Sequence, residues 1–86
     1  MAEKFPIYLE IANGLSIYKL LSESEMVETQ KIGSKYVCHH LLAKIYPEKV
    51  LIADMISNDG KRWVRLTEDE YENKLMHIKS NFKQMF

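Results

Sequence analysis

The chain has 86 residues, of which 47% are apolar and 28% charged, and its formal net charge is zero. These values indicate one soluble globular domain, and they argue against a strongly basic nucleic-acid binder and against an acidic DNA mimic. A single cysteine excludes an internal disulfide, the longest apolar run (VLIA) is too short to span a membrane, and the first ten residues lack the apolar stretch of a secretory leader, so we expect a cytoplasmic protein without a membrane partner.

The first predicted element is a β-hairpin over residues 5–21. Two runs of β-branched and aromatic residues flank Asn13-Gly14, a pair that tolerates the positive φ angles of a tight turn. A two-residue loop places Leu9 opposite Tyr18. We therefore expect one face of the hairpin to be buried through these residues: Ile7, Leu9, Ile11, Tyr18 and Leu20.

Residues 26–32, MVETQKI, form a weaker third strand, because their apolar residues do not alternate cleanly. An alternative is a helix over residues 16–30. Its apolar face would consist of Ile17, Leu20, Leu21, Ser24 and Val27. The Asn13-Gly14 turn favours the hairpin over this helix.

Residues 35–45 are predicted to form a helix, in which Ser34 caps the start and Pro47 enforces the end. As a helix, this segment has one apolar stripe composed of Val37, Cys38, Leu41, Leu42 and Ile45. Cys38 is then buried, and His39 and His40 lie off the stripe in solvent. Adjacent helical residues point about 100° apart, so these three side chains do not converge on one metal ion or one reacting group.

Residues 49–56, KVLIADMI, are predicted to form a strand, and the turn SNDG at residues 57–60 connects it to an antiparallel partner at residues 61–66. The alternation of side chains along that partner places Lys61, Trp63 and Arg65 on one face. Because a tryptophan flanked by two cations does not suit a dry core, we expect Trp63 at a core edge or in an exposed contact site.

The C-terminal segment contains a complete helix start signal. Thr67 is predicted to be the N-cap and Glu70 the third helical residue of a capping box, and Leu66 and Tyr71 can form a hydrophobic staple across it. The helix presents an apolar stripe at helical spacing: Tyr71, Leu75, Ile78, Phe82 and Met85.

No pattern for a cofactor, a metal or a nucleophile emerges. Cys38, His40 and His77 could bind a metal, but their spacing matches no known ligand motif, and the three glycines are scattered singly rather than grouped in a phosphate-binding loop. A small nuclease that uses His39, His40 or His77 as general acid and base is an alternative without further support. We therefore expect a protein that is not an enzyme and has no cofactor.

The charge distribution suggests a binding surface. Residues 1–28 carry a net charge of −3 and residues 29–49 a net charge of +3, while residues 61–65 read KRWVR. Arginine and tryptophan are enriched at protein interface hot spots, and the same residues can bind phosphates and stack on bases. The competing interpretation makes Trp63 a core residue and the cations ordinary solvated side chains. The predicted partner-binding residues are Lys61, Arg62, Trp63, Arg65, Lys31, Lys35, His39 and Lys44.

Together these patterns predict a single α+β domain over residues 1–86, with two helices on an antiparallel sheet of four or five strands and the C-terminal helix packed on one face. The predicted function is non-enzymatic binding of another protein through a mixed apolar and cationic surface, as in small regulatory or inhibitory accessory proteins of phages. The alternative is binding of RNA or single-stranded nucleic acid through residues 31–49 and the strand from Lys61 to Arg65. Domains of this size are often stabilised by association, so a homo-oligomer is also possible.

Overall fold

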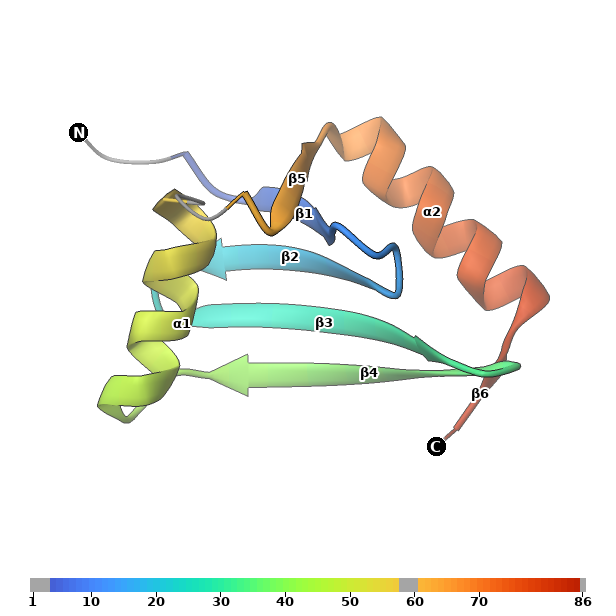
Figure 1. Ribbon diagram of the computed structural model, residues 1–86, viewed down its shortest axis with the longest axis horizontal. Coiled ribbons are helices and arrows are strands. Elements are labelled where there is room, and N and C mark those ends of the chain that lie inside the picture. The colour runs from blue at the N-terminus through green and yellow to red at the C-terminus, as the bar shows by residue number, and fades with distance from the viewer. Residues whose placement is uncertain (1–3, 58–60, 86) are drawn as a thin grey trace.

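A computed structural model describes residues 4–57 and 61–85 (Figure 1). The elements follow in the order β1 (Ile7–Ile11), β2 (Ser16–Ser22), β3 (Glu25–Ile32), β4 (Lys35–Leu42), α1 (Tyr46–Ser57), β5 (Trp63–Leu66), α2 (Glu68–Asn81) and β6 (Lys83–Gln84). The strands form one sheet in the order β5-β1-β2-β3-β4-β6. The α+β class is confirmed, but the sheet has six described strands and is mixed, because β6 pairs with β4 in parallel.

The first hairpin forms as predicted. Leu9 lies opposite Tyr18 and Ile7 opposite Leu20, and Gly14 adopts a φ of 75° in the turn. The amide of Leu15 donates to the side-chain oxygen of Asn13 at 2.9 Å, which fixes the turn locally. Residues 25–32 form the third strand, so the alternative helix over residues 16–30 is wrong.

The helix predicted over residues 35–45 is wrong, because residues 35–42 are the strand β4. The link from β3 to β4 is the pair Gly33-Ser34, and Gly33 adopts a φ of 64° that a tight hairpin turn requires. Ser34 therefore caps no helix. Cys38, predicted to be buried, is exposed, and its Sγ lies 3.6 Å from the Thr29 hydroxyl of the neighbouring strand.

The strand predicted over residues 49–56 is also wrong, because this run lies inside α1. Pro47 occupies the first turn of α1, where its missing N–H costs nothing, so it begins a helix rather than ending one. Glu48 accepts from the amides of Lys44 and Ile45 at 3.0 and 3.3 Å and satisfies donors ahead of the helix. Ile52 and Met55 are the buried residues of α1.

The second predicted hairpin does not form, because β5 pairs with β1 and places Trp63 opposite Ile11. Of the predicted turn at residues 57–60, positions 58–60 lie outside the described residues. Lys61 precedes β5 and has a φ of 55°, so it does not continue the alternation of that strand. Of the trio predicted to share a face, Trp63 and Arg65 lie in the strand and Lys61 does not.

The C-terminal helix begins as predicted. The Thr67 hydroxyl accepts from the amide of Glu70 at 3.1 Å, and the Glu70 carboxylate accepts from the amide of Thr67 at 2.9 Å. These hydrogen bonds hold the pKa of the Glu70 carboxyl below its ordinary value. Tyr71 and Ile78 are the buried residues of α2.

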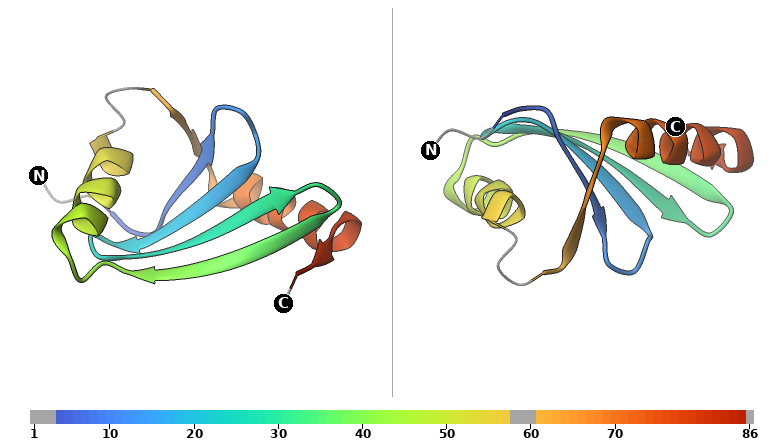
Figure 2. Two further views of the ribbon diagram at one scale, coloured as in Figure 1. Left: turned by 60° about the horizontal axis from the view of Figure 1, so that its bottom comes forward. Right: turned by 90° about the horizontal axis from the view of Figure 1, so that it is seen from above.

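The two helices pack on opposite faces of the sheet, each against its own apolar cluster (Figure 2). The cluster on the α1 side consists of Ile7, Leu9, Tyr18, Leu20, Met26, Ala43, Ile52, Met55 and Trp63. The cluster on the α2 side consists of Tyr8, Ile17, Tyr36, Leu66, Tyr71 and Ile78. Burial on both faces makes the central strands β1 and β2 the most enclosed part of the molecule.

Candidate functional site

The predicted partner-binding residues fall into two groups at opposite sides of the sheet. Arg65 lies in β5 at one edge, with Lys61 and Arg62 just before it, whereas Lys35 and His39 lie in β4 on the other side of the sheet. Three predicted residues remain: Trp63 lies in β5, Lys31 in β3 is on the α2 side, and Lys44 follows β4. The structure therefore does not bring these residues together in one place.

One row of side chains across the α1 face lies between the predicted residues of β5 and those of β4. The register aligns Arg65, Leu9, Tyr18, Glu28 and His39 in that order across five strands. Burial and the Glu28 carboxylate raise the pKa of the Tyr18 phenol, while hydrogen bonding with Ser16 and Trp63 opposes that rise. A half-buried carboxylate and a buried phenol thus separate the cation of β5 from the imidazole of β4.

Trp63 belongs to the core. Its side chain is 7% exposed, it packs in the apolar cluster under α1, and the guanidinium of Arg62 lies 4.7 Å from the centre of its ring. Of the two interpretations of KRWVR, the structure therefore places the tryptophan in the interior. A buried indole cannot serve as an exposed anchor for a partner.

The outer edge of β4 is the part of this region that remains accessible. The strand covers residues 35–42, but β6 pairs only with Lys35 and Tyr36, and the described chain places no other strand on that side (Figure 1). The carbonyl of Tyr36 accepts from Met85 at 2.9 Å, so the even-numbered residues of β4 direct their main-chain groups outward. The amides and carbonyls of Cys38, His40 and Leu42 consequently face away from the sheet.

The side chains along this open edge, residues 37–42, are mostly exposed. His40 Nε2 lies 2.6 Å from Glu25 Oε2, and the two side chains are 54% and 34% exposed. Leu42, at the end of the strand, is 50% exposed. Such an edge can accept a further strand, because its main-chain donors and acceptors are unpaired within the sheet.

Cations and apolar side chains continue beyond both ends of the open edge. Lys35 and Lys83 are exposed near its start, and Lys44 is exposed just past its end. Ile45 and Tyr46 follow with exposures of 60% and 79%. The surroundings of the open edge are therefore cationic, with apolar side chains at the α1 end.

The remaining polar side chains that could bind a metal ion or transfer a proton lie apart from one another in the described chain. Over residues 4–57 and 61–85, no three His, Cys, Asp or Glu side chains gather closely enough to bind a metal ion. His39 and His40 are adjacent in a strand and point to opposite faces, and His77 lies in α2. No helix in the described chain has the length and apolar character needed to cross a membrane.

Comparison with known proteins yields no match: no family model, no curated protein and no solved structure is similar to this chain.

Sequence reasoning identified three residues at or beside the open edge, Lys35, His39 and Lys44, but not the edge itself. The available signal was Gly33-Ser34 between Ile32 and Lys35, a pair typical of two-residue hairpin loops. That signal would have assigned residues 35–42 to a strand. It could not have shown that β6 leaves most of this strand uncovered.

Proposed function

We propose that this chain is a non-enzymatic protein-binding domain, and that its partner adds an extended segment along the open edge of β4. The supporting observation concerns the outer side of β4, the side away from β3. Over residues 38–42 the main-chain groups on this side have no neighbouring strand in the described sheet. Strand addition uses these groups for affinity and the alternating side chains for specificity. Protein binding was expected from the sequence through the surroundings of Trp63 and the basic residues 31–49, and the buried position of Trp63 favours the second of these regions.

The chemistry of the edge favours an acidic partner segment with some apolar residues. Lys35, Lys44 and Lys83 lie near the two ends, where carboxylates of an added strand could pair with them. Leu42 and Ile45 offer apolar contacts beside those cations. A second copy of this chain would instead bring its own lysines and histidines against the same edge, so self-pairing is disfavoured by charge.

The proposal can be tested with a displayed library of random linear peptides selected on the wild-type protein. His40→Pro removes an outward N–H and adds a ring where the partner strand would lie, while His40→Ala removes the imidazole and keeps the N–H. We expect His40→Pro to weaken selected peptides by about tenfold or more and His40→Ala to change binding little. Amide spectra of both variants establish that the sheet outside β4 is intact.

Charge reversal tests the predicted chemistry of the segment. Lys44→Glu should slow association of selected peptides, whereas Lys79→Glu, on the exposed side of α2, should not. Peptides that bind His40→Pro as well as wild type would contradict strand addition. Selected sequences without acidic residues, concentration-dependent self-association through β4, or tighter retention on RNA than on any peptide would contradict the acidic protein segment.

A further inference from the structure

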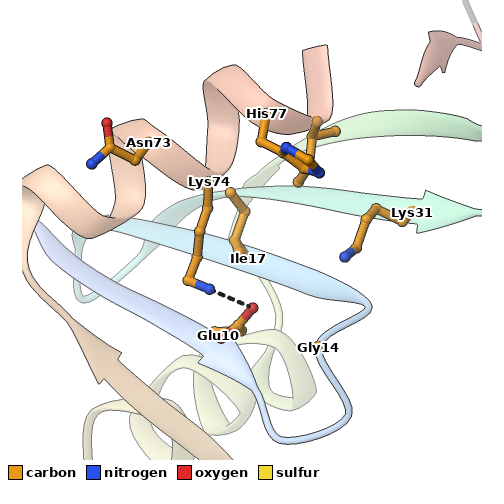
Figure 3. Close-up of a pocket in the computed structure, with 8 residues that line it drawn as sticks. Glu10, Gly14, Ile17, Lys31, Asn73, Lys74 and His77 are labelled. Carbon is orange, nitrogen blue, oxygen red and sulfur yellow. Dashed lines mark ion pairs between the residues drawn. The ribbon is translucent and has the colours of Figure 1, made fainter. Parts of the chain in front are cut away.

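A second feature lies on the opposite face from α1, where α2 crosses the first hairpin. A cleft of about 280 Å³ is lined by Glu10, Gly14, Ile17, Lys31, Asn73, Lys74, His77 and Ile78 (Figure 3). Ile17 and Ile78 are buried and form an apolar floor. The polar lining residues surround this floor, so the cleft combines an apolar base with a charged rim, as small-molecule sites do.

The rim has an excess of positive charge. Lys74 Nζ lies 3.4 Å from Glu10 Oε2, so the only carboxylate of the lining is already engaged. Figure 3 shows Lys74 extending from α2 to Glu10, while Lys31 extends from β3 toward the same space. Lys31 is half-buried, its Nζ lies 5.9 Å from the centre of the Phe82 ring, and no carboxylate of the described chain pairs with it. An ammonium group at the rim of an apolar cleft, with no carboxylate of the described chain paired to it, can attract an anion.

His77 adds a directed donor above Lys31 (Figure 3). The Asn81 amide nitrogen donates to the main-chain carbonyl of His77 at 2.8 Å and lies 3.2 Å from His77 Nδ1. An amide nitrogen can only donate, so this contact suits the imidazole tautomer in which Nδ1 accepts and Nε2 is left to donate elsewhere. The His77 imidazole and two ammonium groups thus border one apolar floor.

We infer that this cleft binds a small organic anion, with a carboxylate or phosphate between Lys31 and His77 and an apolar body on Ile17 and Ile78. Lysine binds either group as a point charge, and an imidazole N–H can add direction. The site lies under α2 and is built from residues that the open edge of β4 does not use. It is therefore independent of the proposed protein-binding function.

The test is a titration of the full chain followed through its backbone amide spectrum. Phenyl phosphate and phenylacetate are the probes for the two anionic groups, benzyl alcohol supplies the ring without charge, and inorganic phosphate supplies the charge without the ring. We expect saturable shifts at the amides of Gly14, Lys31 and His77 with one or both organic anions, and much weaker shifts with the other two compounds. The ratio of the two affinities distinguishes a phosphate ligand from a carboxylate ligand.

Two variants test whether the organic anions bind in this cleft. Lys31→Gln should weaken the better anion by about tenfold, because it removes a charge-assisted hydrogen bond. Lys79→Gln removes an exposed charge of α2 that does not line the cleft, and it should leave the affinity unchanged. The absence of saturable shifts with either organic anion, equal binding of benzyl alcohol, or equal loss in the two variants would overturn the inference.

Discussion

The two edges of the sheet differ in length, burial and accessibility. β5 is four residues long and contributes Trp63 and Leu66 to the two apolar clusters, whereas β4 is eight residues long and most of its side chains are exposed. A short edge strand with charged neighbours offers little template for further pairing, and a long uncovered one offers much. We therefore expect the β5 edge to contribute mainly to stability, and we propose the β4 edge as the place where a partner binds.

The same comparison explains why the cations alone were misleading. Lys61, Arg62 and Arg65 are exposed beside β5, but the tryptophan between them points into the core. At β4 the cations Lys35, Lys44 and Lys83 lie near the two ends of the strand, and they accompany main-chain groups that can bind. The two edges differ in the accessibility of their main-chain donors and acceptors rather than in the local density of positive charge.

The largest expected effect comes from Trp63→Ala at the β5 edge. Removing the indole leaves a cavity in the cluster under α1 and removes the surface on which Arg62 stacks. We expect a loss of about 3–5 kcal/mol in the free energy of unfolding, measured by chemical denaturation. The neighbouring control Val64→Ala, at a residue 52% exposed, should cost less than about 0.5 kcal/mol. Equal losses in the two variants would show that β5 is not anchored through its tryptophan.

A smaller effect is expected where β5 passes into α2. Thr67→Ala removes the hydroxyl that accepts from the amide of Glu70, so it should lower the free energy of unfolding by about 1 kcal/mol. Thr67→Ser keeps the acceptor and should restore most of that loss. A serine variant as unstable as the alanine variant would mean that the methyl group, rather than the capping bond, stabilises this junction.

Alkaline pH should weaken the apolar cluster that contains Tyr71. Burial, assisted by Glu72, Cys38 and Tyr8, raises the pKa of Tyr71 from 10.0 to about 12. Because the folded pKa lies above the unfolded one, the stabilisation is complete below about pH 10 and is lost as the pH rises toward about 12. Tyr71→Phe should therefore reduce the loss of stability in this window.

Denaturation followed from about pH 9 to about pH 11 measures this loss, and tyrosinate absorbance reports the ionisation directly. The ring of Tyr71 lies 4.8 Å from that of Tyr8, whose pKa burial also raises, so the phenylalanine variant should retain part of the pH dependence. An unchanged pH dependence in Tyr71→Phe would exclude Tyr71 as the responsible group.

Strictly local signals predicted the elements that depend on local chemistry. Asn13-Gly14 gave the first hairpin and its register, because a positive φ is required there and few residue pairs tolerate it. The pair Thr67 and Glu70 gave the start of α2, because two side-chain bonds fix that end without tertiary contacts. The sequence therefore sufficed wherever a few adjacent residues determine the backbone.

Hydrophobic periodicity was misleading in the middle of the chain. Residues 35–42 lie at an open edge, where most side chains are exposed on both faces of the strand. Their apolar residues therefore do not alternate as in a half-buried strand, and they also fit the spacing of a helical stripe. The run VLIADMI in α1 was too uniformly apolar to distinguish a buried helix from a buried strand. In both segments the deciding residues, Gly33 and Pro47, lie at the boundary rather than inside the pattern.

The open edge and the cleft depend on distant pairings that the sequence does not reveal. β5 crosses the sheet to pair with β1, and β6 returns to pair with the first two residues of β4. These two pairings determine which edge is short and which remains open. Likewise, Lys31 and Lys74 line one cleft only because α2 crosses the first hairpin, although they are far apart along the chain.

Amide hydrogen exchange along β4 tests the open edge most directly. In the free protein we expect the amides of Cys38, His40 and Leu42 to exchange rapidly, because they point away from β3, while His39 and Leu41 are protected by bonds to β3. A selected peptide should slow exchange in the first group and leave the second unchanged. Slow exchange at Cys38 and His40 in the free protein, or rapid exchange that persists at saturating peptide, would contradict strand addition at this edge.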